Sequence, residues 1–217
     1  MKLKVILTGA TGMVGEGVLH ECLQHDGVEE VLVITRKSCG IIHPKLKEII
    51  HPDFQQLATI EDRLTGYNAC FFCLGVSSVG MKEPEYYKLT YLLTMNFATT
   101  LAGRNPGMTF CYISGAGTNE NGKLMWARVK GKTENDLMKL PFKAVYNFRP
   151  GIIGPTKGLK NTLSFYKYLG WLIPVIQLFG GTVVKLREIG LAMINAATRG
   201  YEKNILEAKD IIALSKK

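Results

Sequence analysis

Short apolar runs rich in β-branched residues alternate along this chain with longer stretches of helical periodicity. The first run, residues 4–8, is followed by residues 13–24, in which Val14, Val18 and Cys22 recur every four positions. The same criteria predict further strands at 30–35, 47–51, 69–74, 109–114 and 143–148. They predict further helices at 84–102, 124–139 and 188–198.

Two of the predicted strands are apolar at nearly every position, Val31 to Ile34 and Cys70 to Leu74. Strands of this composition are buried on both faces, as in a parallel sheet that helices cover on each side. The alternation of strands and helices agrees, because neighbouring parallel strands need crossover connections. The sequence therefore predicts an α/β fold with a doubly wound parallel sheet.

The composition fits a single globular domain: the chain has 217 residues, of which 47% are hydrophobic and 21% charged. Five cysteines, an odd number, do not indicate a disulfide framework. Only three apolar residues, Val5 to Leu7, follow Lys4, which does not resemble a signal peptide. We therefore expect a cytoplasmic protein.

An uncharged run of 17 residues, 168–184, is shorter than the ~20 residues that span a bilayer, and it contains Pro174 and three glycines. We expect a buried or interfacial cap there and no integral membrane insertion, while peripheral membrane contact stays open.

Charge is distributed unevenly. Residues 1–108 hold 10 basic and 11 acidic side chains, and residues 109–217 hold 17 and 7, which gives −1 and +10 and sums to the net +9. Such an imbalance favours anionic ligands near the second half. The lysines are scattered singly, however, and no interleaved basic and aromatic motif of the RNA-binding kind is present. We therefore do not expect nucleic-acid binding.

A glycine-rich segment, Thr8 to Gly15 (TGATGMVG), lies where the first strand turns into the first helix. Gly9 permits a tight turn, Gly12 lets the backbone approach a pyrophosphate, and Gly15 allows helix and sheet to pack closely. The helix N-terminus adds free N–H groups and partial positive charge. This context predicts a dinucleotide site, and a glycine turn without a ligand is the weaker alternative. A P-loop is excluded because no Gly-Lys-Ser/Thr follows.

Several segments within residues 5–155 resemble the short-chain dehydrogenase/reductase superfamily in its atypical, epimerase-like branch, nearest to the Tat-interacting-protein-like group. Besides the glycine motif, they are CLG at 73–75, ISGA at 113–116, VKGKTE at 129–134 and FRPG at 148–151. The resemblance implies a Rossmann-like NAD(P)-binding domain over residues 1–155. It also implies a smaller substrate region over 156–217, packed on the same domain as a small C-terminal cap and matched only loosely, around 191–193.

The end of the second predicted strand carries basic residues where an NAD-binding protein has a carboxylate. That acid, about 20 residues after the glycine motif, binds the ribose 2′-hydroxyl, but here the strand runs into Thr35-Arg36-Lys37-Ser38. A guanidinium and an ammonium can pair with a 2′-phosphate, and Arg36 can also stack on adenine. We therefore expect NADP as the cofactor. The alternative is that Arg36 and Lys37 belong to a solvated loop.

Family resemblance implies further cofactor contacts. Asp53 would lie beside the adenine, Leu74 and Gly75 would line the adenosine ribose, and residues 150–153 would wall the nicotinamide pocket. For the last segment, a strand end followed by a turn is the plainer interpretation. The residues expected to bind cofactor are Thr8, Gly9, Thr11, Gly12, Met13, Val14, Gly15, Arg36, Lys37, Asp53, Leu74, Gly75, Lys130, Pro150, Gly151 and Ile152.

The catalytic positions match the superfamily only in part. In that superfamily a tyrosine four residues before a lysine transfers the proton, and a serine at the preceding strand end holds the substrate oxygen. Ser114 and Lys130 match, but Trp126 stands where the tyrosine is expected. An indole N–H cannot exchange a proton at neutral pH. Loss of general acid–base help typically costs about 10² to 10⁴ in rate, so cofactor binding can outlast efficient catalysis.

Three hypotheses follow for the missing phenol. Another tyrosine could supply the proton, and the candidates are Tyr86, Tyr87, Tyr91, Tyr166 and Tyr168. Alternatively, Ser114 and hydride positioning suffice for an oxidoreductase or epimerase-like reaction on a small-molecule substrate. Thirdly, the protein senses NADP(H) or presents a surface to a partner. Trp126 itself is at least as well explained by helix packing as by stacking on a substrate. The substrate, and the choice between a monomer and a homodimer, stay open.

Two apparent signals carry no chemistry. Cys70 and Cys73 form a CxxC, but residues three apart on a strand point to opposite faces, so their sulfurs cannot easily meet. The four histidines, at 20, 25, 43 and 51, have no metal-ligand spacing with acids or cysteines. We therefore expect no metal.

Overall fold

The computed structural model describes residues 2–154 and 182–217. These residues form a seven-stranded parallel sheet in the order β3-β2-β1-β4-β5-β6-β9. The strands are β1 (Leu3–Thr8), β2 (Val28–Thr35), β3 (Leu46–Ile50), β4 (Ala69–Phe72), β5 (Thr109–Ile113), β6 (Ala144–Arg149) and β9 (Ile205–Glu207). A second, two-stranded parallel sheet pairs β7 (Ile152–Gly154) with β8 (Val183–Lys185).

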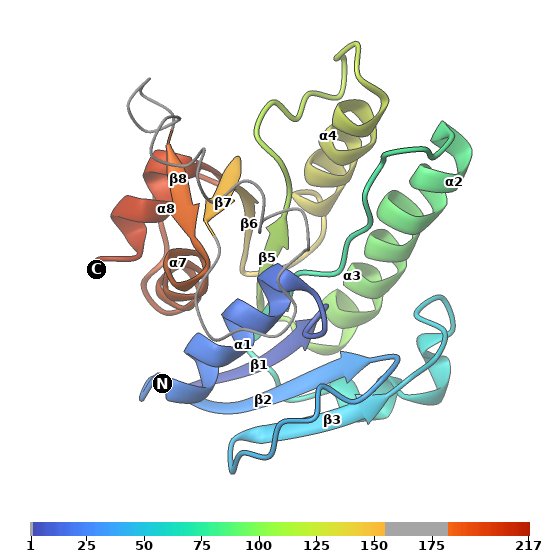
Figure 1. Cartoon of the computed structure of the whole chain (residues 1–217). Helices are drawn as coiled ribbons and strands as arrows, with labels where there is room; N and C mark the ends of the chain where they lie inside the picture. Colours follow the sequence, from blue (N-terminus) through green and yellow to red (C-terminus); the bar gives the residue numbers. More distant parts are fainter. Residues whose placement is uncertain (1, 155–181) are drawn as a thin grey trace.

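Helices cover both faces of the large sheet (Figure 1). The helices on one face are α1 (Met13–Gln24), α7 (Leu186–Arg199) and α8 (Ala208–Leu214). The opposite face packs against α3 (Leu93–Arg104), α4 (Met125–Leu137) and the 3₁₀ turns η1 (Leu57–Thr59) and η2 (Glu61–Leu64). The short helix α2 (Glu83–Tyr87) runs through a π-helical turn, η3 (Lys88–Leu92), into α3. The predicted doubly wound α/β fold is therefore confirmed.

Alternate residues of the central strands fill two separate cores. Val5, Leu7 and Phe71 face α1 and α7, whereas Ile6 and Phe72 face α3. All five are fully buried, which is why these strands read as continuous apolar runs rather than as an alternating pattern.

The strand order places a topological switch point between β1 and β4. Chain connections run from β1 outward to β2 and β3 on one side, and from β4 outward to β5, β6 and β9 on the other. In open α/β sheets, ligands bind beyond the carboxyl ends of the strands at such a point. The glycine-rich segment follows β1, and residues 73–75 follow β4, so both meet there.

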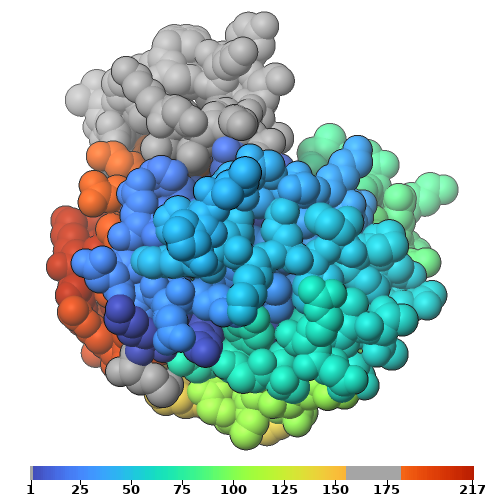
Figure 2. Space-filling model, turned by 90° about the horizontal axis from the view of Figure 1, so that it is seen from below, coloured from blue at the N-terminus to red at the C-terminus, as the bar shows by residue number. Residues whose placement is uncertain are grey.

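Residues of the first third of the chain form most of the surface at the β3 edge of the sheet. Figure 2 views the molecule from this side, and the segment from about β2 to η2 makes up its blue and cyan surface. The carboxyl ends of β2 and β4, which matter for the site described next, belong to this third.

The proposed division of the chain at residue 155 stays a prediction, because residues 155–181 lie outside the described residues. The tyrosines at 166 and 168 and nearly all of the uncharged run 168–184 lie there too. After this segment, residues 182–217 supply β8, α7, β9 and α8, of which β9 extends the large sheet and α7 packs on α1. Among the helices that can be described, none combines the length and the apolar character needed to cross a bilayer.

Candidate nucleotide and catalytic site

The turn from β1 into α1 is built in a way that requires glycine at two positions. Gly9 has φ +74°, and a Cβ placed on it would lie 2.6 Å from the carbonyl oxygen of Cys73. A Cβ on Gly15 would lie only 2.1 Å from the carbonyl oxygen of Gly9. Neither position can accept a side chain without moving backbone, so the loop is held closely against β4 and against its own helix.

Gly12 has more room and a different place in the turn. It is the N-cap of α1 in an extended conformation, its amide donates to the carbonyl of Gly9 at 2.9 Å, and no side chain caps the helix. A Cβ there would meet only the Gly9 oxygen, at 3.4 Å. The amides of the first helical turn, including those of Met13 and Val14, therefore face outward beside exposed Thr11 and Gly12. This geometry fits an anionic diphosphate.

Thr8 contributes to the shape of the site in a way that the sequence did not reveal. Its side chain is fully buried, and its hydroxyl oxygen accepts a hydrogen bond from the amide of Leu74 at 3.3 Å. This bond joins the ends of β1 and β4 at the switch point. Thr8 thus orients the two loops rather than lining the surface.

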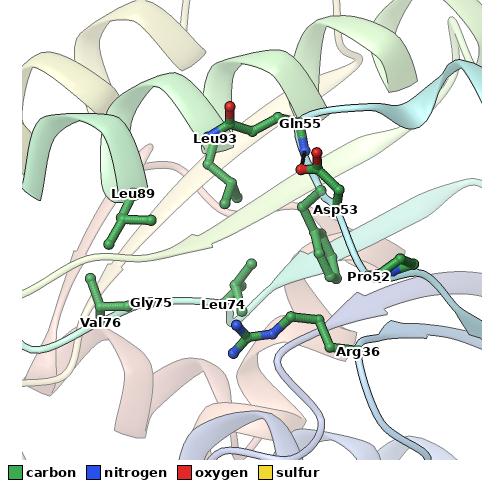
Figure 3. A pocket seen from close by; sticks show the side chains of 10 residues that line it. Arg36, Pro52, Asp53, Gln55, Leu74, Gly75, Val76, Leu89 and Leu93 are labelled. Atoms are coloured by element: carbon green, nitrogen blue, oxygen red, sulfur yellow. Dashed lines mark hydrogen bonds between the residues drawn. The ribbon is translucent and has the colours of Figure 1, made fainter. Parts of the chain in front are cut away.

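A cavity of about 180 Å³ lies beyond the ends of β2 and β4 (Figure 3). Arg36, Asp53, Leu74 and Gly75, which were expected around an adenosine, all line it. Leu89 and Leu93 close it from the helical side, together with Pro52, Phe54, Gln55 and Val76. The mostly apolar walls with one guanidinium and one carboxylate suit a flat heteroaromatic base.

The segment that carries Asp53 is fastened to α3 by Asn96. The side-chain amide of Asn96 donates to the carbonyl oxygens of Phe54 at 3.3 Å and Gln55 at 3.0 Å. Asp53 in turn accepts a hydrogen bond from the amide of Gln55 at 2.9 Å. Asn96 was not expected as part of the site, and only its position in space reveals the contact.

The basic residues after β2 line a second, larger cavity of about 480 Å³ together with Thr11 and Ser38. Arg36 and Lys37 are exposed, and neither forms an ion pair with any residue in the described ranges. Glu48 is the nearby acid, but its carboxylate accepts hydrogen bonds from the Ser38 hydroxyl at 2.7 Å and the Cys39 amide at 2.8 Å. The charge of the two basic side chains is therefore available to an anionic ligand.

The end of β5 holds the predicted serine. Ser114 is buried, and its hydroxyl lies 3.1 Å from that of Thr118. Thr118 donates its own proton to the carbonyl of Gly115 at 2.7 Å, so in this arrangement Ser114 is the donor between the two hydroxyls. The loop at Gly151 lies against the same turn, because a Cβ on Gly151 would be 3.5 Å from the Cβ of Ala116. The structure thus brings Ser114 and the 150–152 segment together.

Lys130 extends from α4 toward the same strand end. Its ammonium donates to the carbonyl oxygen of Ile113 at 3.1 Å and to the hydroxyl of Tyr112 at 3.4 Å. The Nζ atom also lies 5.1 Å from the centre of the Tyr112 ring. Burial lowers the pKa of Lys130 to about 8, although the charge of Glu134 opposes this shift. The amine is therefore bound to the backbone of Ile113, the residue before Ser114, and it can gain or lose a proton near neutral pH.

Trp126 packs across the turn that follows Ser114. A Cβ placed on Gly115 would lie 3.3 Å from its indole ring, and one on Gly117 would lie 3.9 Å away. The side chain is partly buried. The indole therefore stands beside the serine turn on the same helix as Lys130 and one turn earlier, where it adds a flat apolar wall and no exchangeable acid.

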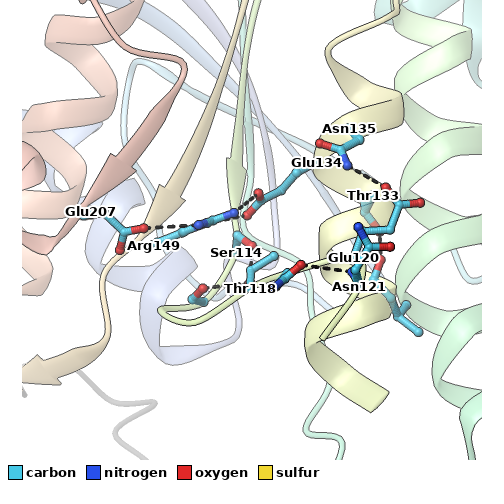
Figure 4. Close-up of polar contacts among 12 residues, drawn as sticks. Ser114, Thr118, Glu120, Asn121, Thr133, Glu134, Asn135, Arg149 and Glu207 are labelled. Carbon is cyan, nitrogen blue, oxygen red and sulfur yellow. Dashed lines mark hydrogen bonds and ion pairs between the residues drawn. The ribbon is translucent and has the colours of Figure 1, made fainter. Parts of the chain in front are cut away.

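A buried ion pair connects β6 with α4 beside the site. Arg149, at the end of β6, donates through Nε to Glu134 of α4 at 2.9 Å and through a second nitrogen to the other carboxylate oxygen. Figure 4 shows Arg149 reaching between Glu134 and Glu207, the latter at 3.2 Å. Glu134 is 1% exposed. The sequence motifs contained both residues, but nothing in their spacing indicated that they would meet.

The described tyrosines that were candidates for proton transfer have other surroundings. Tyr91 donates to Asp136 at 2.8 Å, and Tyr87 stacks on Tyr91 with ring centres 4.6 Å apart. Tyr86 is buried, and burial raises the pKa of its phenol. Tyr112, which was not a candidate, is the tyrosine in contact with Lys130, and burial raises the pKa of its phenol well above the usual range.

All five cysteines are free thiols. Cys70 lies in the core on the α3 side, whereas Cys73 packs against the core on the α1 side, so the expected separation of this pair is confirmed. In the described ranges, no group of three or more His, Cys, Asp or Glu side chains is arranged to hold a metal ion.

Solved structures share this Rossmann-like fold, as expected from the resemblance to the short-chain dehydrogenase/reductase superfamily. The chain resembles the ADP-L-glycero-D-manno-heptose-6-epimerase of Helicobacter pylori, with a TM-score of 0.70, 15% identity, and coverage of 99% of this chain and 81% of that one. It also resembles Bordetella bronchiseptica WbmF in complex with NAD⁺, with a TM-score of 0.65, 16% identity and coverage of 99% and 77%. The expected resemblance to this superfamily is confirmed at the level of the fold.

Several proteins with similar sequences share the name FMP52. The chain is 26% identical to the mitochondrial protein FMP52-1 of Scheffersomyces stipitis over 99% of this chain and 100% of that protein. It is also 26% identical to the mitochondrial protein FMP52 of Candida glabrata, over 94% and 88%. No protein-family model matches the chain.

The names of these relatives overturn one expectation. We expected a cytoplasmic protein because no signal peptide or disulfide framework was evident, but the FMP52 relatives are named mitochondrial. The cytoplasmic prediction is therefore wrong. The short apolar run Val5 to Leu7, on which the expectation rested, does not distinguish among the compartments of a cell. The predictions about nucleic acid, membrane contact and oligomeric state stay predictions.

Proposed function

We propose that this protein binds NADP(H) across the carboxyl ends of β1, β2 and β4 and acts as an oxidoreductase or epimerase-like enzyme on a small-molecule substrate. One observation carries the proposal. Arg36 lines both the apolar cavity that Asp53 and Leu74 line and the larger cavity beside Thr11. A base in the first cavity and a phosphate in the second would therefore share one guanidinium, with the amides of the glycine turn alongside.

The residues present fit the cofactor at each part of its length. The glycine turn at Gly9 and Gly15 excludes side chains where a diphosphate would approach, and the first turn of α1 has no side-chain cap. Arg36 and Lys37 supply positive charge without a competing described ion pair. When bound, NADPH supplies a hydride. Ser114 and Lys130 lie together at the end of β5, where they could hold and protonate a substrate oxygen.

Cofactor preference tests the binding half of this proposal. The dissociation constants of NADPH and NADH should be measured for the wild type and for Arg36→Ala. The wild type should prefer NADPH by tenfold or more, and Arg36→Ala should lose most of this preference, because a charge-assisted hydrogen bond contributes roughly 1.5–3 kcal/mol. Arg63→Ala is the matched control: Arg63 is exposed in η2, near the amino end of β4. Equal affinities of the wild type for the two cofactors would refute the NADP assignment.

A second candidate function is an NADP(H)-sensing or interaction module. It is favoured because Trp126 occupies the position where a proton-donating tyrosine was expected. Oxidation of NADPH should be followed against a panel of aldehydes, ketones and nucleotide-sugars. Turnover that Lys130→Ala abolishes would support the enzyme. Tight NADPH binding without turnover on the whole panel would favour the sensor.

We also propose that the protein resides in mitochondria, on the strength of its FMP52 relatives alone. Cell fractionation with an antibody against the full chain, using matrix and outer-membrane markers, tests this assignment. Recovery only in the cytosolic fraction would refute it.

A further inference from the structure

The candidate catalytic site lacks the expected phenol but contains an amine in a suitable place. Lys130 Nζ is 3.1 Å from the carbonyl oxygen of Ile113 and 3.4 Å from the hydroxyl of Tyr112. No described carboxylate forms an ion pair with it. Most lysines near a carboxylate stay charged through that partner, whereas this amine is held by two neutral oxygens.

We propose that Lys130 is the proton donor to the substrate oxygen, in place of the tyrosine that Trp126 replaces, and that Tyr112 positions its amine. This inference rests on the proposed oxidoreductase function. Tyr112 is a positioning residue because its own side chain is 1% exposed and cannot reach a substrate directly.

In the reduction of a carbonyl, the carbonyl carbon would accept a hydride with its two electrons from NADPH, and the π electrons of the C=O bond would move to oxygen. That oxygen takes a proton from the Lys130 ammonium, so an O–H bond forms and an N–H bond breaks. Lys130 is left as a neutral amine and regains its proton from water.

The charged groups around Lys130 are compatible with this cycle. Glu134, one turn later on α4, is the acid that favours the charged amine, and its carboxylate is engaged by Arg149 of β6. Tyr112 of β5 contributes a phenol that burial keeps neutral. Tyr86 of α2 also raises the pKa of the Tyr112 phenol. Burial lowers the pKa of Lys130 to about 8, so the ammonium can release a proton near neutral pH.

The titration of Lys130 can be measured without cofactor or substrate. The protein should be treated with limiting acetic anhydride across pH 6 to 11, and acetylation of the peptide containing Lys130 quantified by mass spectrometry against Nα-acetyl-lysine. The midpoint for Lys130 should lie near pH 8, at least one unit below that of the reference compound, whose pKa is about 10.4. A midpoint equal to that of the reference would overturn the proposal.

Measurements of kcat then distinguish proton donation by Lys130 from an effect of its positive charge alone. With NADPH and 4-nitrobenzaldehyde as the probe, kcat should fall as pH rises through the midpoint found by acetylation. Lys130→Arg keeps a positive charge but cannot release a proton, so kcat at saturating NADPH should fall by about 10² to 10⁴. Methylamine should restore part of the rate to Lys130→Ala. Tyr112→Phe should lower kcat more than it changes KM and should move the midpoint.

The outcomes distinguish this proposal from the one on which it rests. Wild-type turnover that Lys130→Arg retains would overturn Lys130 as the donor and leave the oxidoreductase function standing. Failure of the wild type to bind NADPH, or to oxidise it with any carbonyl probe, would overturn both. Loss of turnover in Lys130→Arg at saturating NADPH, together with rescue of Lys130→Ala by methylamine, would support the proposal.

Discussion

Arg149 and Glu134 join the last long strand of the sheet to the helix that carries Lys130. The guanidinium of Arg149 donates to both carboxylate oxygens of Glu134, and only 14% of the Arg149 side chain is exposed. The contact with Glu134 raises the pKa of Arg149. Because α4 also carries Trp126, this pair fastens the helix that holds both Trp126 and Lys130.

Removal of the arginine should therefore destabilise the fold. Arg149→Met leaves the carboxylate of Glu134 buried without its partner, which typically costs about 3–5 kcal/mol. Urea unfolding should show a loss of this order. Lys4→Met is the control, since Lys4 pairs with Glu29 on the surface, where ion pairs contribute about 1 kcal/mol or less. Equal losses in the two variants would contradict the structural role of the buried pair.

The glycine turn offers a way to separate folding from cofactor binding. Gly15→Ala should lower the melting temperature by several degrees, because the new Cβ would meet the Gly9 carbonyl at 2.1 Å. Gly12→Ala should leave the melting temperature nearly unchanged, since the nearest atom to its Cβ is 3.4 Å away. It should nevertheless weaken NADPH binding at least tenfold by keeping the diphosphate from the backbone.

Differential scanning fluorimetry with and without NADPH measures both effects. If Gly12→Ala binds NADPH as tightly as the wild type, the diphosphate does not approach the protein at this turn, and the proposed cofactor position is wrong.

The sequence predicted the elements that have a local signal, and it missed those that form only through contacts with distant residues. The bounds of α1, Met13–Gln24, were predicted to the residue, because the glycine turn precedes it and apolar positions recur along its length. The predicted helix 84–102 is interrupted by the π-helical turn Lys88–Leu92, which no local pattern signals. The strand Ile205–Glu207 was missed, because three residues give no periodicity and it forms only by pairing with β6.

The same difference separates the residues of the candidate site that were expected from those that were not. Arg36 was expected near an adenine from its place after the second strand, and Leu74 was expected near the ribose from family resemblance. Both line one cavity, because parallel strands end at a common edge of the sheet. By contrast, Asn96 holds the segment at Asp53, which lines this cavity, from a helix more than 40 residues away, and Tyr112 contacts Lys130 from a buried strand position. Such contacts arise from packing between elements, so a single sequence read locally could not contain them.

The low pKa of Lys130 has a consequence for stability that needs no substrate. In the unfolded chain the lysine pKa is about 10.4, and in the folded protein it is about 8, so between these values the unfolded state binds more protons. Stability of the wild type should therefore gain from this group as pH rises from 8 to 10. Below pH 8 the folded protein carries the full cost of the buried charge.

Lys130→Met should consequently be more stable relative to the wild type at pH 7 than at pH 10, by roughly 1–2 kcal/mol after allowance for partial exposure. Urea unfolding at the two pH values gives the difference. Lys209→Met, at an exposed position of α8, should show the same change in stability at both pH values. A Lys130→Met effect that does not vary with pH would show that burial does not perturb this amine.

Restoring the phenol at position 126 discriminates between the hypotheses about the proton donor. Trp126→Tyr places a hydroxyl four residues before Lys130 on the same face of α4, beside the turn at Gly115. If the wild-type site has no proton donor, the substitution should raise kcat with NADPH and 4-nitrobenzaldehyde by 10² or more. If Lys130 already donates the proton, as we expect, the gain should stay below tenfold, because a second acid adds little to a step that is already assisted. Trp126→Phe removes the indole without adding a hydroxyl and serves as the control for changes in packing. A rise of 10² in Trp126→Tyr and none in Trp126→Phe would contradict Lys130 as the proton donor of the wild type.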